Sequence, residues 1–359
     1  MNLNELFKIM VDREASDLYL RTMAYPRARI NGRIEVISSE TVTKPEMLAV
    51  ANLLLANEQR RKKFADNMDI DFIHEEPEAG RFRINIFMQR GTPALVARHV
   101  QRRIKTFEEL NLPVELSKKF CEESKGLFLV CGPAGNGKST MIASMIEYVN
   151  QNSAKHILTI EDPIEFLFMD KKSIINQREL ELDVPSFPSA LKHMTQQSPD
   201  IIYIGNIRDE PTMRAAIMAA ELGTFVFTTF HTINAVQTII RMVNFFPPHL
   251  HDEVRMQLSL ILKGTVSLRL LPRKDGQGRV PAFETMVVTP TIASLIREGK
   301  IQSIQSFIDD GKFFGMQSFR QSLVRLVKEG LVEEGEARLL ADSKDEFDLE
   351  LKGIRSHFK

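Results

Sequence analysis

The residues from Gly132 to Ser139 combine glycines, a lysine and a serine at the spacing G-x4-G-K-S. Backbone N–H groups of such a loop converge on phosphate oxygens at a helix N-terminus, where the helix dipole also favours anions. We expect Lys138 to reach the β- and γ-phosphates of a triphosphate and Ser139 to ligate Mg²⁺. An ordinary glycine-rich turn is the alternative, but an apolar run before the loop and a helical stripe after it favour phosphate binding. The predicted nucleotide-binding residues are Gly132, Pro133, Ala134, Gly135, Asn136, Gly137, Lys138, Ser139 and Thr140.

A phosphate loop needs a second, acidic strand to hold the metal's outer shell. Asp200 directly precedes the apolar run Ile201–Ile204. We predict that Asp200 belongs to the nucleotide site and holds the metal through water. The alternative is an aspartate that caps a helix after Pro199.

Two further elements place polar groups just after apolar runs. Glu161 and Asp162 follow the run 156–160, with Glu165 close behind, and His231 follows the run 225–227. Ligands bind at the carboxyl ends of strands in open α/β sheets. We therefore predict that Glu161 polarises water or tunes the metal, and that His231 senses the γ-phosphate. The alternatives are a solvated loop and a structural histidine.

The elements that position these residues divide the chain in two. Residues 1–100 are predicted to form a small α+β domain with mainly antiparallel strands. It has an opening helix with apolar residues Leu3, Leu6, Phe7 and Met10, a hairpin turn at Asn31-Gly32, a helix over 46–64 and a strand over 81–87. Residues 101–112 are predicted as a linker. Residues 113–290 alternate apolar strands with helices, which predicts an α/β core, and 291–359 are helical.

Composition excludes several classes of protein. The 47 basic and 47 acidic residues balance, so a chain that grips nucleic acid mainly through phosphates is disfavoured. The 2 cysteines exclude a disulfide framework and a four-cysteine zinc site. The start does not read as a signal peptide, and no run reaches the roughly 18 apolar residues of a membrane span. We expect a protein of a reducing compartment without a transmembrane segment.

These elements, in this order and spacing, resemble the secretion ATPase superfamily and within it the PilT/PilU-type twitching-motility ATPases of type IV pili. The resemblance runs from Ser16-Asp17-Leu18 through Gly80–Asn85, the acidic loop 160–166 and the region around His231 to Gly315–Phe319. It implies a PAS-like N-terminal domain, a RecA-like P-loop core with a helical C-terminal extension, and hydrolysis of ATP with Mg²⁺. The further N-terminal domain and four-cysteine motif of pilus-assembly ATPases do not fit this chain.

The resemblance also implies partners and further site residues. Arg83 and Arg98 match arginines of the N-terminal domain that line the nucleotide, although exposed strand arginines are the plain alternative. The segment Ile292–Lys300 resembles one associated with pilus retraction; a packing helix is the alternative. The family implies a cytoplasmic homohexamer, or a mixed assembly with a paralogous ATPase, at the inner-membrane pilus platform protein. No nucleic acid is expected.

Two segments depart from the family pattern. Asn206 stands in Gly205-Asn206-Ile207-Arg208 where the family ordinarily has the glutamate that positions the attacking water. An amide orients water but accepts no proton, so turnover is expected to be slow, with Glu161 taking part of the role. Ala220–Thr224 also differs from the usual Ala-Glu-Thr-Gly-His. Three functions stay open: a retraction motor, a weakly hydrolysing regulatory partner of a more active paralogue, and a DNA translocase, which the zero net charge disfavours.

Overall fold

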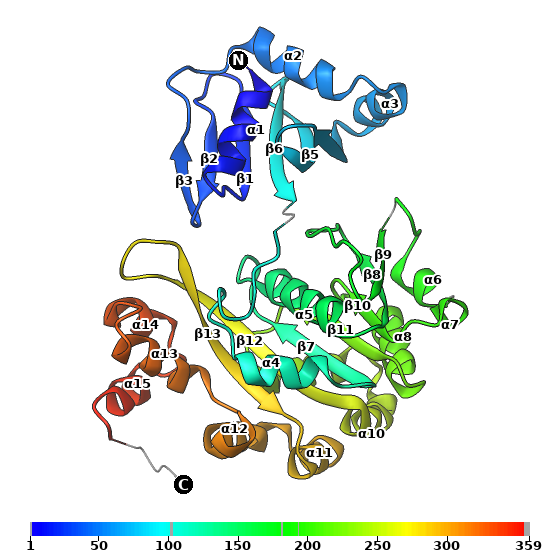
Figure 1. The fold of residues 1–359 in the computed structure, drawn as a ribbon, viewed down its shortest axis with the longest axis vertical. Coiled ribbons are helices and arrows are strands. Elements are labelled where there is room, and N and C mark those ends of the chain that lie inside the picture. The colour runs from blue at the N-terminus through cyan, green and yellow to red at the C-terminus, as the bar shows by residue number, and fades with distance from the viewer. Residues whose placement is uncertain (1, 101–102, 181, 193, 355–359) are drawn as a thin grey trace. The chain divides into compact units, whose positions relative to one another are not determined.

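The computed structural model describes residues 2–100, 103–180, 182–192 and 194–354. The chain forms two compact units, Met1–Arg102 and Arg103–Lys359, which we describe separately (Figure 1). The division falls within the predicted linker 101–112, whose residues Gln101 and Arg102 lie outside the described part. The rest of that segment packs into the C-terminal unit, where Phe107 and Leu112 are buried. Residues 355–359 of the predicted helical region also lie outside the description.

The N-terminal unit is an antiparallel sheet in the order β3-β2-β1-β6-β5-β4, with helices packed on it. The hairpin turn is as predicted, because Asn31 and Gly32 both have positive φ between β2 and β3. The opening helix is also confirmed, with the four predicted apolar residues buried. The elements are α1 Leu3–Asp12, β1 Asp17–Arg21, β2 Arg27–Ile30, β3 Arg33–Val36, α2 Lys44–Leu54, α3 Glu58–Asn67, β4 Asp69–Glu76, β5 Gly80–Gln89 and β6 Thr92–Val100.

The single helix predicted over 46–64 is wrong. The chain leaves the helix after Leu54 and starts again at Glu58, because the side chain of Asn57 accepts hydrogen bonds from the backbone N–H groups of Gln59 and Arg60. Such a cap satisfies donors that a continuous helix would use internally.

The C-terminal unit is a seven-stranded sheet in the order β13-β12-β7-β11-β10-β8-β9. Among the strands that the structure describes in this sheet, only the pair β12–β13 is antiparallel. Its elements are α4 Val114–Cys121, β7 Gly126–Cys131, α5 Lys138–Asn152, β8 His156–Glu161, β9 Ile174–Glu179, α6 Phe187–Lys192, α7 Met194–Gln197, β10 Ile201–Ile204, α8 Glu210–Glu221, β11 Phe225–Phe230, α9 Ala235–Asn244, the 3-10 helix η1 Pro248–Leu250, α10 His251–Ile261, β12 Leu262–Pro272 and β13 Arg279–Val287. The α/β fold class is therefore confirmed.

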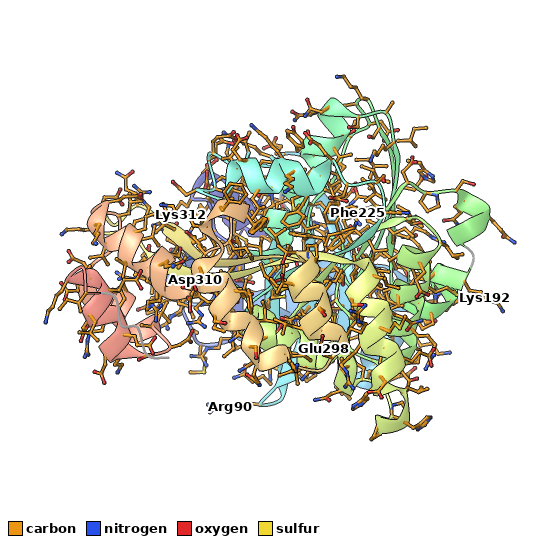
Figure 2. The ribbon with its side chains drawn as sticks, turned by 90° about the horizontal axis from the view of Figure 1, so that it is seen from below. Arg90, Lys192, Phe225, Glu298, Asp310 and Lys312 are labelled. Carbon is orange, nitrogen blue, oxygen red and sulfur yellow. The ribbon has the colours of Figure 1, made fainter. Side chains whose placement is uncertain are left out.

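Two apolar layers enclose this sheet. Alternate side chains of a strand point to opposite faces, and both faces of a covered parallel sheet are apolar. Phe128 and Val130 of β7 pack with α4 and α5, whereas Leu127 and Leu129 pack with α8, α9 and α10. Phe225, which Figure 2 labels together with the exposed residues Glu298, Asp310 and Lys312, is fully buried in this packing. This explains why the strands read as continuous apolar runs in the sequence.

The C-terminal helices continue the core. They are α11 Pro290–Arg297, η2 Ile301–Ser303, α12 Ile304–Asp310, η3 Gly311–Phe314, α13 Phe319–Lys328, α14 Glu334–Leu340 and α15 Lys344–Leu351. Ile292, Ile296 and Ile304 join the layer of α9 and α10, and α13–α15 pack on β12 and β13. In the described ranges, no helix combines the length and the apolar character that crossing a bilayer requires.

Candidate nucleotide site

The predicted phosphate loop connects β7 to the first turn of α5, at the carboxyl edge of the parallel sheet. Gly132 has φ +141°, and a Cβ there would lie 2.6 Å from the carbonyl oxygen of Leu268. Gly137 has φ +85° and stands at the N-cap of α5. Both glycines are required by the backbone itself, since side chains are strained at such angles. The result is a helix N-terminus that faces an open loop, which suits phosphate binding.

Residues distant in sequence hold this loop in place. The Asn136 side chain donates to the carbonyl oxygen of Ala134 (3.2 Å) and accepts from the backbone N–H of Leu270 (2.8 Å). Arg279 Nη1 donates to the carbonyl oxygen of Gly135 (3.2 Å). β12 and the edge strand β13 therefore preorganise the loop, and sequence patterning did not predict either strand.

Lys138 lies buried under the loop. Its ammonium donates to the carbonyl oxygens of Gly132 (2.8 Å) and Pro133 (3.0 Å) and lies 3.3 Å from Nδ1 of His231. Burial lowers the pKa of Lys138 and of His231, and the cation of Lys138 lowers the pKa of His231 further. His231 is thus a neutral imidazole at neutral pH. The structure thus brings the predicted lysine and histidine together.

Three carboxylates lie at or just beyond the end of β8. Glu161 is buried and accepts from Thr159 Oγ1 (2.7 Å) and Gln177 Nε2 (3.2 Å). Burial raises the pKa of Glu161 to about 7. Asp162 pairs with Arg208 (3.3 Å). Glu165 accepts a hydrogen bond from the Ser139 hydroxyl (3.0 Å), so it contacts the predicted metal ligand. We did not select Glu165 from the sequence, although it stands in the same acidic loop.

Asn206 follows Gly205, whose backbone lies against Glu161. The N–H of Gly205 donates to the carbonyl oxygen of Ile160 (2.8 Å), and a Cβ on Gly205 would lie 3.2 Å from Cα of Glu161. The buried Oδ1 of Asn206 has no hydrogen-bond partner among the described residues. This unpaired acceptor points to a water or ligand donor in the site, since buried polar atoms are normally paired.

The prediction for Asp200 is wrong. Asp200 precedes β10, level with His156, whose backbone N–H donates to Asp200 Oδ2 (2.8 Å). In the parallel register, Ile201 aligns with Phe225 and Phe225 with Gly126, which begins β7. Asp200 therefore lies at the amino edge of the sheet, about 20 Å of strand from the loop after Cys131, at roughly 3.3 Å per residue. It acts as a bridge between strands and ligates no metal bound at Ser139.

Arg83 and Arg98 lie opposite each other on β5 and β6 of the N-terminal unit. Arg83 pairs with Asp71 (2.7 Å) and Arg98 with Asp17 (3.0 Å). Both guanidinium groups are thus held by carboxylates of their own unit. A role at a nucleotide would require each to exchange that carboxylate for phosphate.

The oxygen ligands around Ser139 fit Mg²⁺, which prefers hydroxyl, carboxylate and water oxygens. Ser139 Oγ and the Glu165 carboxylate that it bonds to supply such atoms. No preformed cluster of three or more histidine, cysteine or carboxylate ligands occurs in the described part of the chain. A metal here would depend on phosphate and water oxygens for its other ligands. Thr140, also predicted to bind nucleotide, lies in the same first turn, where its carbonyl accepts from Ser144 (3.1 Å).

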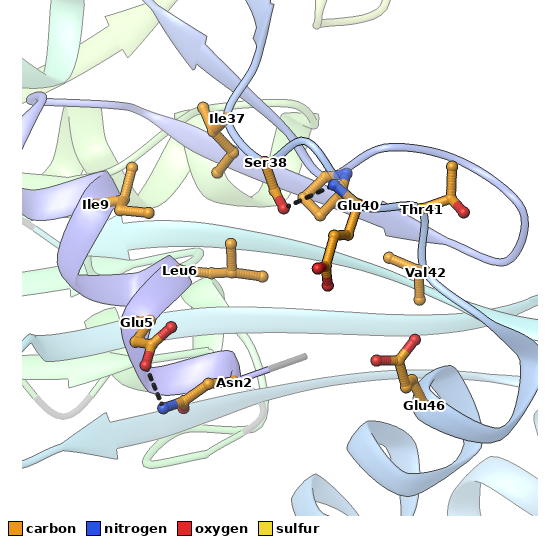
Figure 3. Close-up of a pocket in the computed structure, with 11 residues that line it drawn as sticks. Asn2, Glu5, Leu6, Ile9, Ile37, Ser38, Glu40, Thr41, Val42 and Glu46 are labelled. Atoms are coloured by element: carbon orange, nitrogen blue, oxygen red, sulfur yellow. Dashed lines mark hydrogen bonds between the residues drawn. The ribbon is translucent and has the colours of Figure 1, made fainter.

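A separate hollow of about 170 Å³ lies in the N-terminal unit between α1 and the start of α2 (Figure 3). Leu6 and Val42 contribute apolar walls, and Glu5, Glu40 and Glu46 contribute carboxylates. None of the predicted site residues lines it.

A parallel sheet with a glycine-rich strand–loop–helix at its carboxyl edge is typical of α/β proteins that bind phosphate groups there. The chain belongs to the family of type II/IV secretion system proteins, whose profile matches residues 2–338. It is 38% identical to the type IV pilus ATPase PilU of Pseudomonas aeruginosa, over 98% of this chain and 92% of that protein. It is 39% identical to the retraction ATPase PilT of the same organism, over 97% of this chain and 100% of that protein.

Solved structures agree with these relatives. The crystal structure of the pilus retraction motor PilT with bound ADP matches with a TM-score of 0.85 at 39% identity, over 96% of this chain and 98% of that one. The ATPase DotB of Legionella pneumophila matches with a TM-score of 0.82 at 23% identity, over 94% of each chain, which shows a shared fold. The resemblance to PilT/PilU-type ATPases is confirmed.

Proposed function

We propose that this protein is a Mg²⁺-dependent ATPase that drives pilus retraction in a type IV pilus machine. The observation that carries the proposal is the contact of Lys138 with His231 under a glycine-rich loop, with Glu165 hydrogen-bonded to Ser139 in the first turn of the following helix. Full-length similarity to proteins named for pilus retraction and twitching motility supports the biological role. The bound ADP of the PilT structure supports a nucleotide as ligand.

The binding steps follow from the hydrogen bonds of the loop. Lys138 exchanges the carbonyl oxygens of Gly132 and Pro133 for β- and γ-phosphate oxygens. Ser139, oriented by Glu165, supplies a hydroxyl ligand to Mg²⁺. The neutral imidazole of His231 hydrogen-bonds to the γ-phosphate. When bound, Mg²⁺ neutralises charge on the phosphate oxygens.

The chemical step needs a group that takes a proton from water. Glu161 is suited to this task because its pKa of about 7 leaves it partly ionised at neutral pH and basic enough to accept a proton. Asn206, next to it, orients the attacking water through its unpaired Oδ1. Arg83 and Arg98 of a neighbouring copy complete the site by neutralising the transferred phosphoryl group, an effect worth about 10³–10⁵ in rate.

The assembly follows from this division of the site between copies. We propose a cytoplasmic homohexamer, or a mixed ring with a paralogous ATPase, that works at the inner-membrane pilus platform protein. The N-terminal unit of one copy contributes the arginines and the C-terminal unit of another contributes the phosphate loop. Cycles of ATP binding and hydrolysis then move one unit against the other.

A second candidate function is a nucleotide-binding subunit that hydrolyses ATP slowly and regulates a more active paralogue. Asn206 favours it, because the amide at this position accepts no proton. Single-turnover measurements separate the two functions. A chemical step slower than about 10⁻³ per second would favour regulation, whereas a rate near the 1 per second typical of enzymes would favour a motor.

The test of the main proposal combines chemistry and motility. The purified protein should hydrolyse Mg-ATP, and Lys138→Ala should abolish both hydrolysis and tight ATP binding. Deletion of the gene should leave surface pili but remove surface motility, and only the wild-type gene should restore it. Retained motility in the deletion strain would reject the retraction role, and absent nucleotide binding would reject the enzyme.

A further inference from the structure

A buried carboxylate outside the phosphate site connects three elements of the C-terminal unit. Glu284 lies on β13 with 3% of its surface exposed. Its Oε1 accepts a hydrogen bond from the backbone N–H of Ala235 (2.8 Å), the first residue of α9. Its Oε2 accepts from the side chain of Gln305 on α12 (3.5 Å). One side chain thus bonds to the start of α9 and to a C-terminal helix.

The start of α9 is also the end of the loop that carries His231. Only residues 231–234 separate the end of β11 from Ala235. The hydroxyl of Thr232 is 2.6 Å from that of Thr238 on the first turn of α9, and Thr238 donates to Sγ of Cys131 (3.2 Å), which precedes Gly132. Any shift of the start of α9 therefore moves His231 relative to Lys138.

The bond to Ala235 is of a kind that fixes a helix end. The first N–H groups of a helix have no internal partner, and a carboxylate there gains from both the hydrogen bond and the helix dipole. The Asn234 side chain already caps Gln237. Glu284 supplies a second anchor from another strand, which sets the position of α9 against the sheet.

We propose that Glu284 is a positioning residue: it sets the distance between His231 and the phosphate loop through the start of α9. Through Gln305 it also links α12 to that distance. This inference rests on the proposed ATPase function, and it assigns Glu284 no contact with nucleotide. Movement of the C-terminal helices thereby changes how well His231 meets the γ-phosphate.

The experiment compares two nucleotides that differ in the γ-phosphate. Glu284→Ala should lower the affinity for a non-hydrolysable ATP analogue about tenfold, the size of loss expected when the γ-phosphate loses its hydrogen bond to His231. ADP affinity should stay within about twofold of wild type, because ADP lacks the group that His231 meets. Glu284→Gln keeps an acceptor oxygen and should restore most of the ATP preference. Equal losses for both nucleotides, or no loss, would overturn the inference.

Two further variants distinguish a specific effect on ATP binding from a general loss of stability. Ser322→Ala deletes another buried hydrogen bond of β13, from the N–H of Phe283 (3.0 Å), and should leave the ATP preference unchanged. Ala235→Pro removes the donor from the other side of the bond at a helix position that tolerates proline, and serves if Glu284→Ala does not fold. Ala235→Pro should show the same selective loss, and an unchanged preference would count against the inference.

Two further outcomes separate the parts of the argument. Gln305→Leu should also reduce the ATP preference, but by a smaller factor than Glu284→Ala. An unchanged ATP preference in Gln305→Leu would show that α12 does not act on His231 through Glu284. His231→Ala combined with Glu284→Ala should be no worse than His231→Ala alone; additive losses would contradict action through His231. If the wild-type protein binds neither nucleotide, the proposed function fails. If the wild-type protein binds both and Glu284→Ala shows the same ATP preference, the proposed function stands and only this inference fails.

Discussion

Nζ of Lys138 lies 3.3 Å from Nδ1 of His231, although the two residues are 93 positions apart in the chain. The contact joins the phosphate loop after β7 to the loop after β11, its neighbour in the sheet. An ammonium group beside an imidazole disfavours a second positive charge, so His231 serves as an uncharged hydrogen-bonding group. A triphosphate placed between the two would meet one cation and one neutral donor.

The electrostatic part of this contact can be measured without nucleotide. In Lys138→Ala the pKa of His231 should rise, because one of the causes that depress it is removed while burial remains. Titration of the histidine resonances by NMR would show the shift, with His231→Gln as the assignment control. Lys138→Arg keeps the charge and should leave the pKa of His231 depressed. An unchanged titration in Lys138→Ala would mean that the contact has no electrostatic consequence.

The rate of hydrolysis should rise as pH increases through about 7. Below that pH Glu161 holds a proton and cannot accept one from water; above it the carboxylate is available. Glu161→Gln should lower turnover by about 10²–10⁴ and remove this limb of the profile. Burial also raises the pKa of Glu284 to about 7, so Glu284→Gln is the matched control. In Glu284→Gln the rise of the rate with pH should remain. If only Glu284→Gln flattens the profile, Glu161 is not the base.

Stability should change with pH in the opposite sense. Burial raises the pKa of Glu161 and Glu284 from 4.5 to about 7, so between these values the folded chain holds protons that the unfolded chain has lost. The free energy of unfolding must then fall as pH rises from about 4.5 to 7, by at most roughly 3–4 kcal/mol per group, and stay level above that pH. Urea unfolding of wild type and of each glutamine variant at pH 5 and 8 would test this. A variant with the wild-type pH dependence would show that its carboxyl contributes none of it.

Sequence patterns predicted the residues that lie on short local elements. The glycines, Lys138 and Ser139 form one strand–loop–helix, and the apolar runs of β7, β8, β10 and β11 are buried on both faces. The patterns did not reveal which end of β10 faces the site, because an acidic residue before a strand reads like one after it. Asp200 was misplaced for that reason. The long strands β12 and β13, which carry Leu270 and Glu284, lack the short apolar runs by which the other strands were found.

Replacement of Asn206 by glutamate should raise turnover, by about 10-fold or more if the missing carboxylate limits the chemical step. The new carboxylate would lie near Glu161, and like charges raise each other's pKa, so the rise in rate with pH should also move to higher pH. Steady-state rates of wild type and Asn206→Glu across pH 6–9 would show both effects. Asn206→Gln is the control, because glutamine has the length of glutamate but carries no charge. Equal rates for all three proteins would show that Asn206 costs nothing.

If each site uses arginines from a neighbouring copy, two inactive variants should complement each other when they are mixed. Arg83→Ala should retain ATP binding, because its phosphate loop is intact. Its turnover should fall by about 10³ or more, because the arginine that neutralises the transferred phosphoryl group is missing. Lys138→Ala lacks a working loop yet carries intact Arg83 and Arg98. Mixing the two inactive proteins should therefore restore part of the activity, because some sites combine a working loop with a working arginine. Arg33→Ala, an exposed strand arginine of the same unit, should remain active alone.

The ion pairs of the N-terminal unit make this test sharper. Arg83 must leave Asp71 to reach a phosphate, so Asp71→Asn should weaken the competing pair and raise turnover modestly. Arg98 is held by the buried carboxylate of Asp17, which Arg29 also contacts at 3.4 Å, so Asp17→Asn should mainly lower stability.

If the mixture of Arg83→Ala and Lys138→Ala regains no activity although both proteins are assembled, the complete site lies within one copy. Activity in the mixture that depends on Arg83 of the Lys138→Ala partner would instead require a site shared between neighbours.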